Sequence, residues 1–254
     1  MLIDHPNGEY RFLKGIAPYS CGVVATPGHE IIHATLKHPM DWREGFQGIA
    51  NYLSEMGLQK SSLCAVQLRC PAPYPMHGFI DFNEDYLEVL RSWKLYVGDL
   101  NPIARTNVAP LNSPPIAPQL YAFSFVTKTR MTRPTFIVAG AGELRDGILD
   151  QTGIIRAGET SEDAMLEKAT YVIQVMTERI QGLSCGWADV NRTNLYSCHP
   201  VHQALQKAVL PAMGRAALHG VNVFATRPPV VDIEFEMDVR GVCQERTIVS
   251  LGKP

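Results

Sequence analysis

Two stretches of this chain read alike: TNVAPLNSPP at residues 106–115 and VNVFATRPP at residues 221–229. Each contains an Asn-Val pair, at Asn107 and at Asn222, and each reaches a Pro-Pro pair ahead of a run typical of a β-strand. The two stretches lie about half of the 254-residue chain apart, and a period of that size indicates two copies of one domain. We therefore expect tandem domains at residues 1–128 and 129–254, and any site must be argued in each copy separately.

The composition is that of an ordinary globular protein, with 46% hydrophobic and 19% charged residues. The formal net charge of −2 gives no general electrostatic reason to bind nucleic acid or an anionic membrane. The sequence contains no run of 18 or more apolar residues, so it predicts no membrane-spanning helix. The first residues, MLIDHPNGEY, lack the regions of a signal peptide, and the six cysteines form no CxxC pair. We expect a cytoplasmic protein with no nucleic-acid or membrane partner.

Turn signals and apolar spacing predict the elements of the first half. GVVAT (22–26) and EIIHATL (30–36) flank Pro27-Gly28, which predicts a hairpin. Asp41 is placed to cap a helix that ends near Gly57. The remaining predictions are a strand at 61–70, a helix at 83–93, and strands near 104–109 and 119–127.

The second half repeats this order of elements. Its strongest signal is a helix with a T-x-x-D capping pattern at Thr160 and Asp163, followed by an apolar stripe that we assign to the core: Met165, Ala169, Val172, Met176 and Ile180. Strands are predicted at 135–144, 187–198, 220–226 and 232–239, with a short helix at 201–210. Two helices against a mixed sheet in each copy indicate an α+β fold. The free face of each sheet then needs cover from the sister domain or another chain.

Separated motifs in both halves resemble the Rid family, the reactive intermediate deaminases. They are IAPYS (16–20), FNEDY (82–86) and IARTNV (103–108) in the first half, and VAGAGEL (138–144), DVNRTNLY (189–196) and VDIEFEM (231–237) in the second. The resemblance implies chorismate-mutase-like (RidA-like) domains that assemble in threes, with sites in clefts between neighbouring domains. It also implies hydrolysis of amino-acid-derived enamines and imines with no metal or organic cofactor.

The resemblance assigns roles to residues of the first copy. Arg105 matches the arginine that holds the substrate carboxylate, a task that suits a planar, permanently charged guanidinium. Tyr19 matches a tyrosine of the cleft, Asn83 matches a polar position on the second helix, and Asn107 lies in the same motif as Arg105. The glutamate position of the family falls on or beside Tyr121, so this copy lacks a carboxylate to handle water. We expect Tyr121 to bind substrate together with Arg105, Tyr19, Asn83, Asn107 and, from the second copy, Gly140.

The second copy shows the reverse pattern. Glu234 matches the glutamate of the family and Gly140 matches a glycine of an early strand. The arginine position falls near residues 218–220, where His219 is the ionisable residue. Each copy therefore keeps a different part of the pattern.

Structural explanations compete with these roles. Arg105 would also suit a salt bridge with a surface acid. Alternation along VDIEFEMDV places Asp232, Glu234 and Glu236 on one face of a strand, and a solvated acidic face is the alternative to a catalytic glutamate.

Two groups have the side chains of metal ligands: Cys198-His199 with His202, and His29 with His33 and His38. Neither gives a complete ligand set at standard spacing. Packing or solvent exposure accounts for both, so we expect no metal.

These observations predict a cofactor-independent hydrolytic deaminase of a small carboxylated enamine or imine, of the 2-aminoacrylate or 2-aminomuconate type. Arg105 would fix the carboxylate and Glu234 would orient or deprotonate water. One alternative is a non-catalytic protein that binds a carboxylate ligand, and another is a chorismatase-like lyase or hydrolase. If the threefold assembly of single-domain relatives is retained, three tandem chains form a homotrimer.

Overall fold

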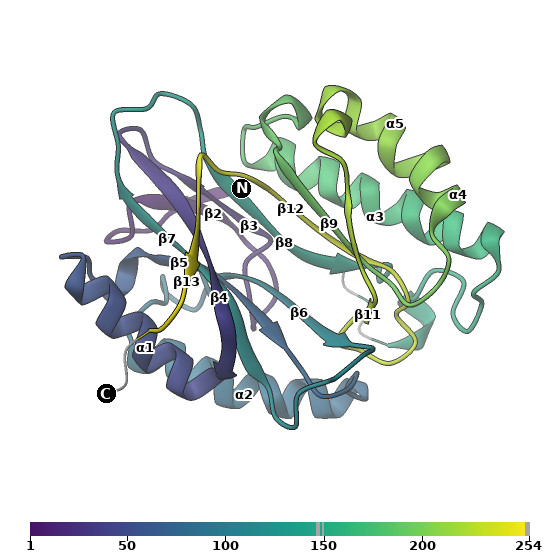
Figure 1. The fold of residues 1–254 in the computed structure, drawn as a ribbon, viewed down its shortest axis with the longest axis horizontal. Coiled ribbons are helices and arrows are strands. Elements are labelled where there is room, and N and C mark those ends of the chain that lie inside the picture. The colour runs from purple at the N-terminus through teal and green to yellow at the C-terminus, as the bar shows by residue number, and fades with distance from the viewer. Residues whose placement is uncertain (146–147, 149, 252–254) are drawn as a thin grey trace.

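The computed structural model describes residues 1–145, 148 and 150–251. Within these residues the strands form two sheets (Figure 1). The seven-stranded sheet has the order β1 (Leu2–Asp4), β2 (Tyr10–Leu13), β3 (Gly22–Ala25), β8 (Phe136–Gly142), β12 (Glu236–Gly241), β9 (Arg192–Tyr196), β10 (Asn222–Phe224). The six-stranded sheet has the order β11 (Thr226–Arg227), β6 (Ala104–Pro110), β5 (Leu63–Arg69), β7 (Gln119–Lys128), β4 (His29–Asp41), β13 (Gln244–Ile248).

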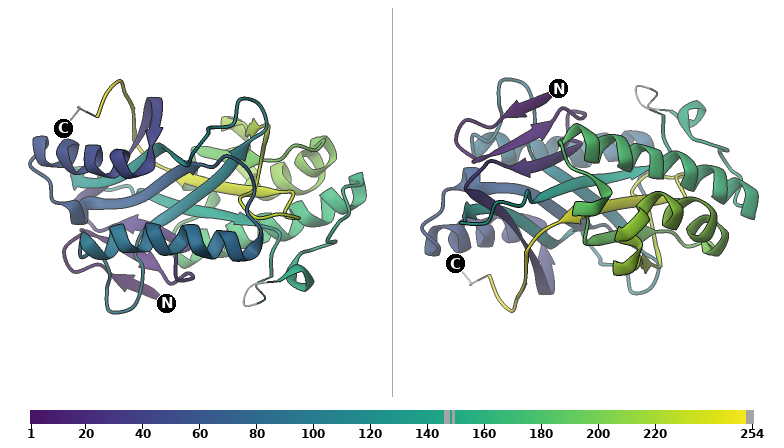
Figure 2. Two further views of the ribbon diagram at one scale, coloured as in Figure 1. Left: turned by 90° about the horizontal axis from the view of Figure 1, so that it is seen from below. Right: turned by 90° about the horizontal axis from the view of Figure 1, so that it is seen from above.

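Helices cover the outer faces of both sheets (Figure 2). The six-stranded sheet packs against α1 (Trp42–Glu55) and α2 (Met76–Ser92). The seven-stranded sheet packs against α3 (Glu162–Gly182) and a second helical stretch made of α4 (His202–Ala204), a π-helical turn (Leu205–Val209) and α5 (Leu210–Met213). The α+β class expected from the sequence is therefore observed. No helix among the described residues has the length and apolar character needed to cross a bilayer.

The inner faces of the two sheets pack on each other. An apolar cluster joins Phe12 and Ile137 of one sheet to Ile31, Ala65 and Val126 of the other. Beyond this cluster the contact becomes polar, and Gln67 on β5 donates a 3.2 Å hydrogen bond to Asp238 on β12. Each sheet thus covers the face of the other sheet that the helices leave free.

One order of elements occurs twice in the fold. The series β4-α1-β5-α2-β6-β7 corresponds to β8-α3-β9-α4/α5-β10-β12. The strand order β6-β5-β7-β4 recurs as β10-β9-β12-β8, and the pair β5/β6 is parallel like the pair β9/β10. The similar stretches around Asn107 and Asn222 therefore lie on corresponding strands, β6 and β10.

The strands that flank the two repeats in the sequence each pair with the more distant repeat. Strand β3 pairs with β8 of the second repeat, and β13 pairs with β4 of the first. The hairpin predicted from residues 22–26 and 30–36 is therefore wrong. The turn at Pro27-Gly28 is present, with Gly28 at φ 82°, but it carries the chain from one sheet to the other. The division at residue 128 stays a prediction.

Local signals located most elements and misplaced some of their ends. Asp41 caps α1 as expected, and its Oδ1 accepts a 2.8 Å hydrogen bond from Arg43 N. The cap of α3 is Ser161 rather than Thr160, while the predicted apolar stripe of this helix is buried. The strand expected at 232–239 begins only at Glu236. Glu234 therefore lies outside the strand, and the predicted face that joined it to Asp232 and Glu236 does not form.

Candidate active site

Arg105 lies on β6 with its side chain turned toward α2. The residue is 2% exposed, and its Nη2 donates a 2.7 Å hydrogen bond to Asn83 Oδ1. Its guanidinium carbon lies 4.6 Å from the ring centroid of Tyr86 and 5.2 Å from that of Tyr19. The predicted residues Arg105, Asn83 and Tyr19 are therefore neighbours, and the rings and the amide together orient a buried cation. Burial lowers the pKa of Arg105, but a guanidinium keeps its charge at any working pH.

Glu236, the first residue of β12, is the carboxylate at this site. It is 5% exposed, and its Oε1 occupies the space that a Cβ at Gly140 would need. Gly140 N donates a 3.1 Å hydrogen bond to Oγ1 of Thr106, the residue after Arg105. Gly140 thus lets a carboxylate of the second repeat approach β6 of the first. The side chains of Arg105 and Glu236 interact electrostatically.

The environment of Glu236 favours its protonated form. Burial raises the pKa of this carboxyl well above its usual value, and the charges of Asp238 and Glu143 raise it further. Arg179 and Arg105 act in the opposite direction. A buried carboxyl whose pKa is raised in this way is suited to proton transfer.

Arg179, on α3, is a second cation at the site. Its Nη1 donates to the carbonyl oxygens of Ala139 and Gly140, at 3.2 and 3.4 Å. Arg179 therefore donates to the carbonyl oxygen of Gly140, while the carboxyl of Glu236 lies beside the Cα atom of the same residue. Arg179 and Tyr19 are both partly exposed, so the site reaches solvent on this side.

Asn107 lies two residues after Arg105 on β6, and side chains at that spacing share one face of a strand. Asn107 is 3% exposed, and neither its amide nitrogen nor its amide oxygen has a hydrogen-bond partner among the described residues. Buried amides are normally satisfied. Both polar atoms of this amide are therefore unsatisfied within the described part of the chain.

An aromatic and aliphatic wall covers the site. Tyr74 stacks on Phe82 of α2 with 5.6 Å between ring centroids. The backbone of Tyr74 bonds to Pro229 O and to Val231 N, at 2.8 and 3.0 Å. Val230 and Ile233 lie in the segment between β11 and β12, residues 228–235. They pack against Ile154 and the rings of Tyr19 and Tyr74. The segment that leads into Glu236 thus forms part of the wall.

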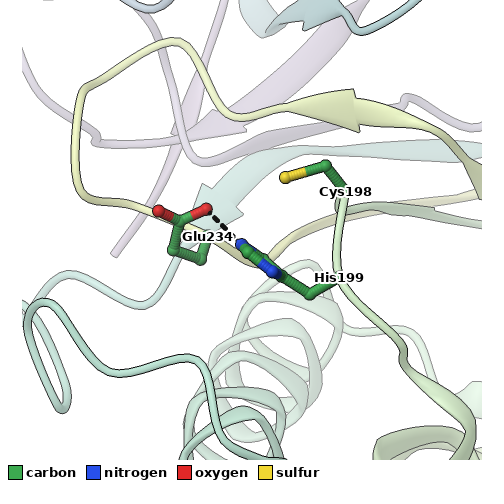
Figure 3. A group of neighbouring side chains, drawn as sticks. All are labelled: Cys198, His199 and Glu234. Carbon is green, nitrogen blue, oxygen red and sulfur yellow. Dashed lines mark hydrogen bonds and ion pairs between the residues drawn. The ribbon is translucent and has the colours of Figure 1, made fainter.

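Tyr121 and Glu234 contact residues other than Arg105. Tyr121, on β7, lies under the guanidinium of Arg69 at 3.8 Å and lines a cavity of about 230 Å³ with Arg192 and Arg240. Glu234 turns to His199, with 2.8 Å between Glu234 Oε2 and His199 Nε2 (Figure 3). His219, which lies near the position where the second copy lacks the family's arginine, is exposed.

A duplicated order of α+β elements, with an arginine of one repeat and a glutamate of the other buried together, defines a Rid-like protein. The sequence profile of the family described as "2-aminomuconate deaminase CnbZ" matches residues 2–246, and the chain belongs to this family. It is accordingly an enzyme, a hydrolytic deaminase, as the sequence predicted.

Known proteins are similar to the whole chain or to part of it. The 2-amino-5-chloromuconate deaminase of Comamonas testosteroni is 36% identical over 246 residues, which cover 95% of this chain and 96% of that protein. A crystal structure of a chorismatase is 10% identical and covers 92% of this chain and 75% of its own, with a TM-score of 0.44. A putative endoribonuclease from Klebsiella pneumoniae is 16% identical and covers 45% of this chain and 96% of its own, with a TM-score of 0.29. The two structural likenesses are too distant to add to the family assignment.

Proposed function

We propose that the chain deaminates an enamine or imine of a 2-aminomuconate-type dicarboxylic acid, with Arg105 and Glu236 as the central pair. The observation that carries this proposal is the burial of both side chains in one group between the repeats. The relative from Comamonas testosteroni, which by its name acts on a chlorinated 2-aminomuconate, supports the substrate class.

In this reaction one water replaces the amino group, and the products are a 2-oxo acid and ammonia. The Glu236 carboxyl gives its proton to the enamine carbon, which yields the imine. Water then adds to the imine carbon while the Glu236 carboxylate accepts a proton from it. Glu236 passes that proton to the amino nitrogen, the C–N bond breaks as ammonia leaves, and the hydroxyl proton returns to the Glu236 carboxylate as the carbonyl forms. The carboxyl is thereby restored and no other reactant is required. Arg105 holds the adjacent carboxylate through this sequence.

A dicarboxylic substrate needs a second cation. Nη1 of Arg179 is engaged by the carbonyl oxygens of Ala139 and Gly140, and the side chain is partly exposed. Its position beside Gly140 supports a role as the partner of the distal carboxylate. The free amide of Asn107 is available to the amino or the carboxylate group.

Glu236 thus takes the part that the sequence suggested for Glu234. Glu234 is already bonded to His199, while Glu236 lies against Gly140 and interacts electrostatically with Arg105. Family membership favours this deaminase reading over a purely ligand-binding protein or a chorismatase-like enzyme.

We also propose a cytoplasmic homotrimer. Strand β10 ends the seven-stranded sheet among the described residues, and Val223 on it is 48% exposed. An open edge with apolar residues favours contact with another chain. A trimer mass in multi-angle light scattering is expected at micromolar concentration, and a monomer mass would contradict it.

Release of ammonia tests the proposed reaction. Wild-type protein should release ammonia from freshly generated 2-aminomuconate-type enamine, and Arg105→Ala should lose most of kcat/KM. If wild-type protein releases none, or if Arg105→Ala is as fast as wild type, the mechanism is wrong.

A further inference from the structure

Three side chains with metal-binding chemistry meet outside the Arg105 site: Cys198, His199 and Glu234 (Figure 3). One ligand atom from each lies within 4.8 Å of the other two. The side chains of His199 and Glu234 are 24% and 22% exposed, and Cys198 is also partly buried. A solvated ion can therefore reach a group that is already partly desolvated.

The two backbone segments that carry these ligands are held together. Ser197 Oγ donates a 2.8 Å hydrogen bond to Glu234 O and accepts a 3.2 Å bond from His199 N. On the other side, Glu143 accepts the backbone N–H groups of Glu234 and Phe235, at 2.7 and 3.0 Å. Such fixed supports reduce the ordering needed when an ion binds.

A buried ion pair anchors this support in turn. Glu143 Oε1 lies 3.0 Å from Lys168 Nζ, and neither side chain is exposed. Lys168 also donates a 2.7 Å hydrogen bond to Ile155 O. The backbone of Glu234 is therefore fixed from the core of the second repeat.

The donor set selects the class of ion. A thiolate, an imidazole and a carboxylate are all ligands of Zn²⁺, whereas Mg²⁺ and Ca²⁺ prefer oxygen donors alone. Three protein ligands leave the fourth tetrahedral position to water. Tetrahedral zinc-ligand bonds of about 2.0–2.3 Å set neighbouring donor atoms about 3.3–3.8 Å apart. The 2.8 Å contact between His199 Nε2 and Glu234 Oε2 must therefore open slightly when the ion binds.

We propose that Cys198, His199 and Glu234 bind one Zn²⁺ per chain and thereby join the segment after β9 to the segment before β12. Sequence alone paired Cys198-His199 with His202, whereas the fold supplies Glu234 as the third ligand. This inference does not depend on the proposed deamination, because it concerns binding of the ion and is measured without substrate.

Metal-depleted, full-length protein titrated with Co²⁺ and Zn²⁺ tests the proposal. We expect one equivalent of Co²⁺ to give a thiolate-to-cobalt charge-transfer absorption that Zn²⁺ abolishes by displacement. Cys198→Ser should remove the band, and His199→Gln and Glu234→Gln should each weaken affinity about tenfold or more. Two controls, Cys185→Ser and His202→Gln, alter a partly buried thiol and a nearby histidine outside the group and should bind like wild type.

Bound Zn²⁺ should also raise the thermal midpoint of wild-type protein, because a ligand of the folded state stabilises it. Absence of the cobalt band in wild type would overturn the proposal whether or not the variants fold. Binding that survives Cys198→Ser but disappears in Cys243→Ser, which alters an exposed thiol, would overturn it as well. Circular dichroism identifies any variant that is unfolded.

Discussion

Glu236 lies so close to Gly140, on the paired strand β8, that a Cβ at position 140 would have to displace the Glu236 carboxyl. The glycine is needed for space rather than for backbone freedom, because its φ is not in the left-handed region. This close approach lets a carboxylate of the second repeat reach the arginine of the first.

The first prediction follows from this contact. Gly140→Ala should displace the carboxyl of Glu236 and reduce kcat by about a hundredfold, the usual effect of a displacement near 1 Å at a reacting group. Ammonia release measures the loss. Gly186→Ala is the matched control, since its nearest neighbour to a new Cβ is 3.9 Å away, and it should keep wild-type activity. Equal activity of the two variants would contradict the placement of Glu236.

Arg179 supplies the second prediction. Arg179→Gln should raise KM for a dicarboxylic enamine about 10- to 100-fold, because a charge-assisted hydrogen bond contributes about 1.5–3 kcal/mol. A monocarboxylic enamine lacks the distal group, so its KM should change little. Steady-state kinetics on both substrates, with Arg43→Gln as an exposed control, make the comparison. A similar loss on both substrates would show that Arg179 does not bind the distal carboxylate.

Much of the fold was predictable because it depends on local signals. The stretches around Asn107 and Asn222 identified strands that correspond in the two sheets, and Asp41 and the apolar stripe of α3 marked two helices. The pairing of β3 with β8 and of β13 with β4 was not predictable. Partner choice among strands depends on contacts across the whole chain, and the Pro27-Gly28 turn is compatible with either outcome.

The candidate site divides in the same way. The motif around Arg105 located Arg105, Asn107 and, through the resemblance, Asn83 and Tyr19. Alternation along VDIEFEM could not separate Glu234 from Glu236, since both fall on the same predicted face. The difference arises because β12 begins at Glu236. Arg179 had no signal in the sequence, because a partly exposed arginine on a helix resembles any other.

The buried ion pair of Glu143 and Lys168 supplies the third prediction. Lys168→Met leaves Glu143 as a buried charge without its partner, and such a change costs about 3–5 kcal/mol of unfolding free energy. Urea denaturation should show this loss, together with weaker activity, because Glu143 fixes the backbone just before Glu236. Lys207→Met, at an exposed lysine, should change stability by less than about 0.5 kcal/mol. A Lys168→Met protein as stable as wild type would refute the structural role of the pair.

His33 supplies the fourth prediction, on pH. Burial lowers the pKa of His33 well below 6.5, and the cations Arg240, Arg192 and Arg69 lower it further. The folded protein therefore keeps His33 neutral, while the unfolded chain binds a proton below about pH 6.5. Stability should fall as the pH drops from about 6.5 toward the depressed pKa, with a slope of up to about 1.4 kcal/mol per pH unit from this residue.

Urea denaturation between pH 5 and 7 checks this slope. His33→Gln retains a side chain that can bond to Ser124 and should make stability less dependent on pH. His38→Gln, at an exposed histidine, should keep the wild-type dependence. If His33→Gln leaves the slope unchanged, His33 is not the group that causes it.

The central claim is that Glu236, and not Glu234, handles the proton and the water beside Arg105. The most direct measurement compares the rate of ammonia release by Glu236→Gln and Glu234→Gln on freshly generated 2-aminomuconate-type enamine. Loss of a general acid and base should lower kcat of Glu236→Gln by about 10²- to 10⁴-fold, while Glu234→Gln should stay within about tenfold of wild type. A folded Glu236→Gln protein with wild-type kcat, or a greater loss in Glu234→Gln, would contradict the account.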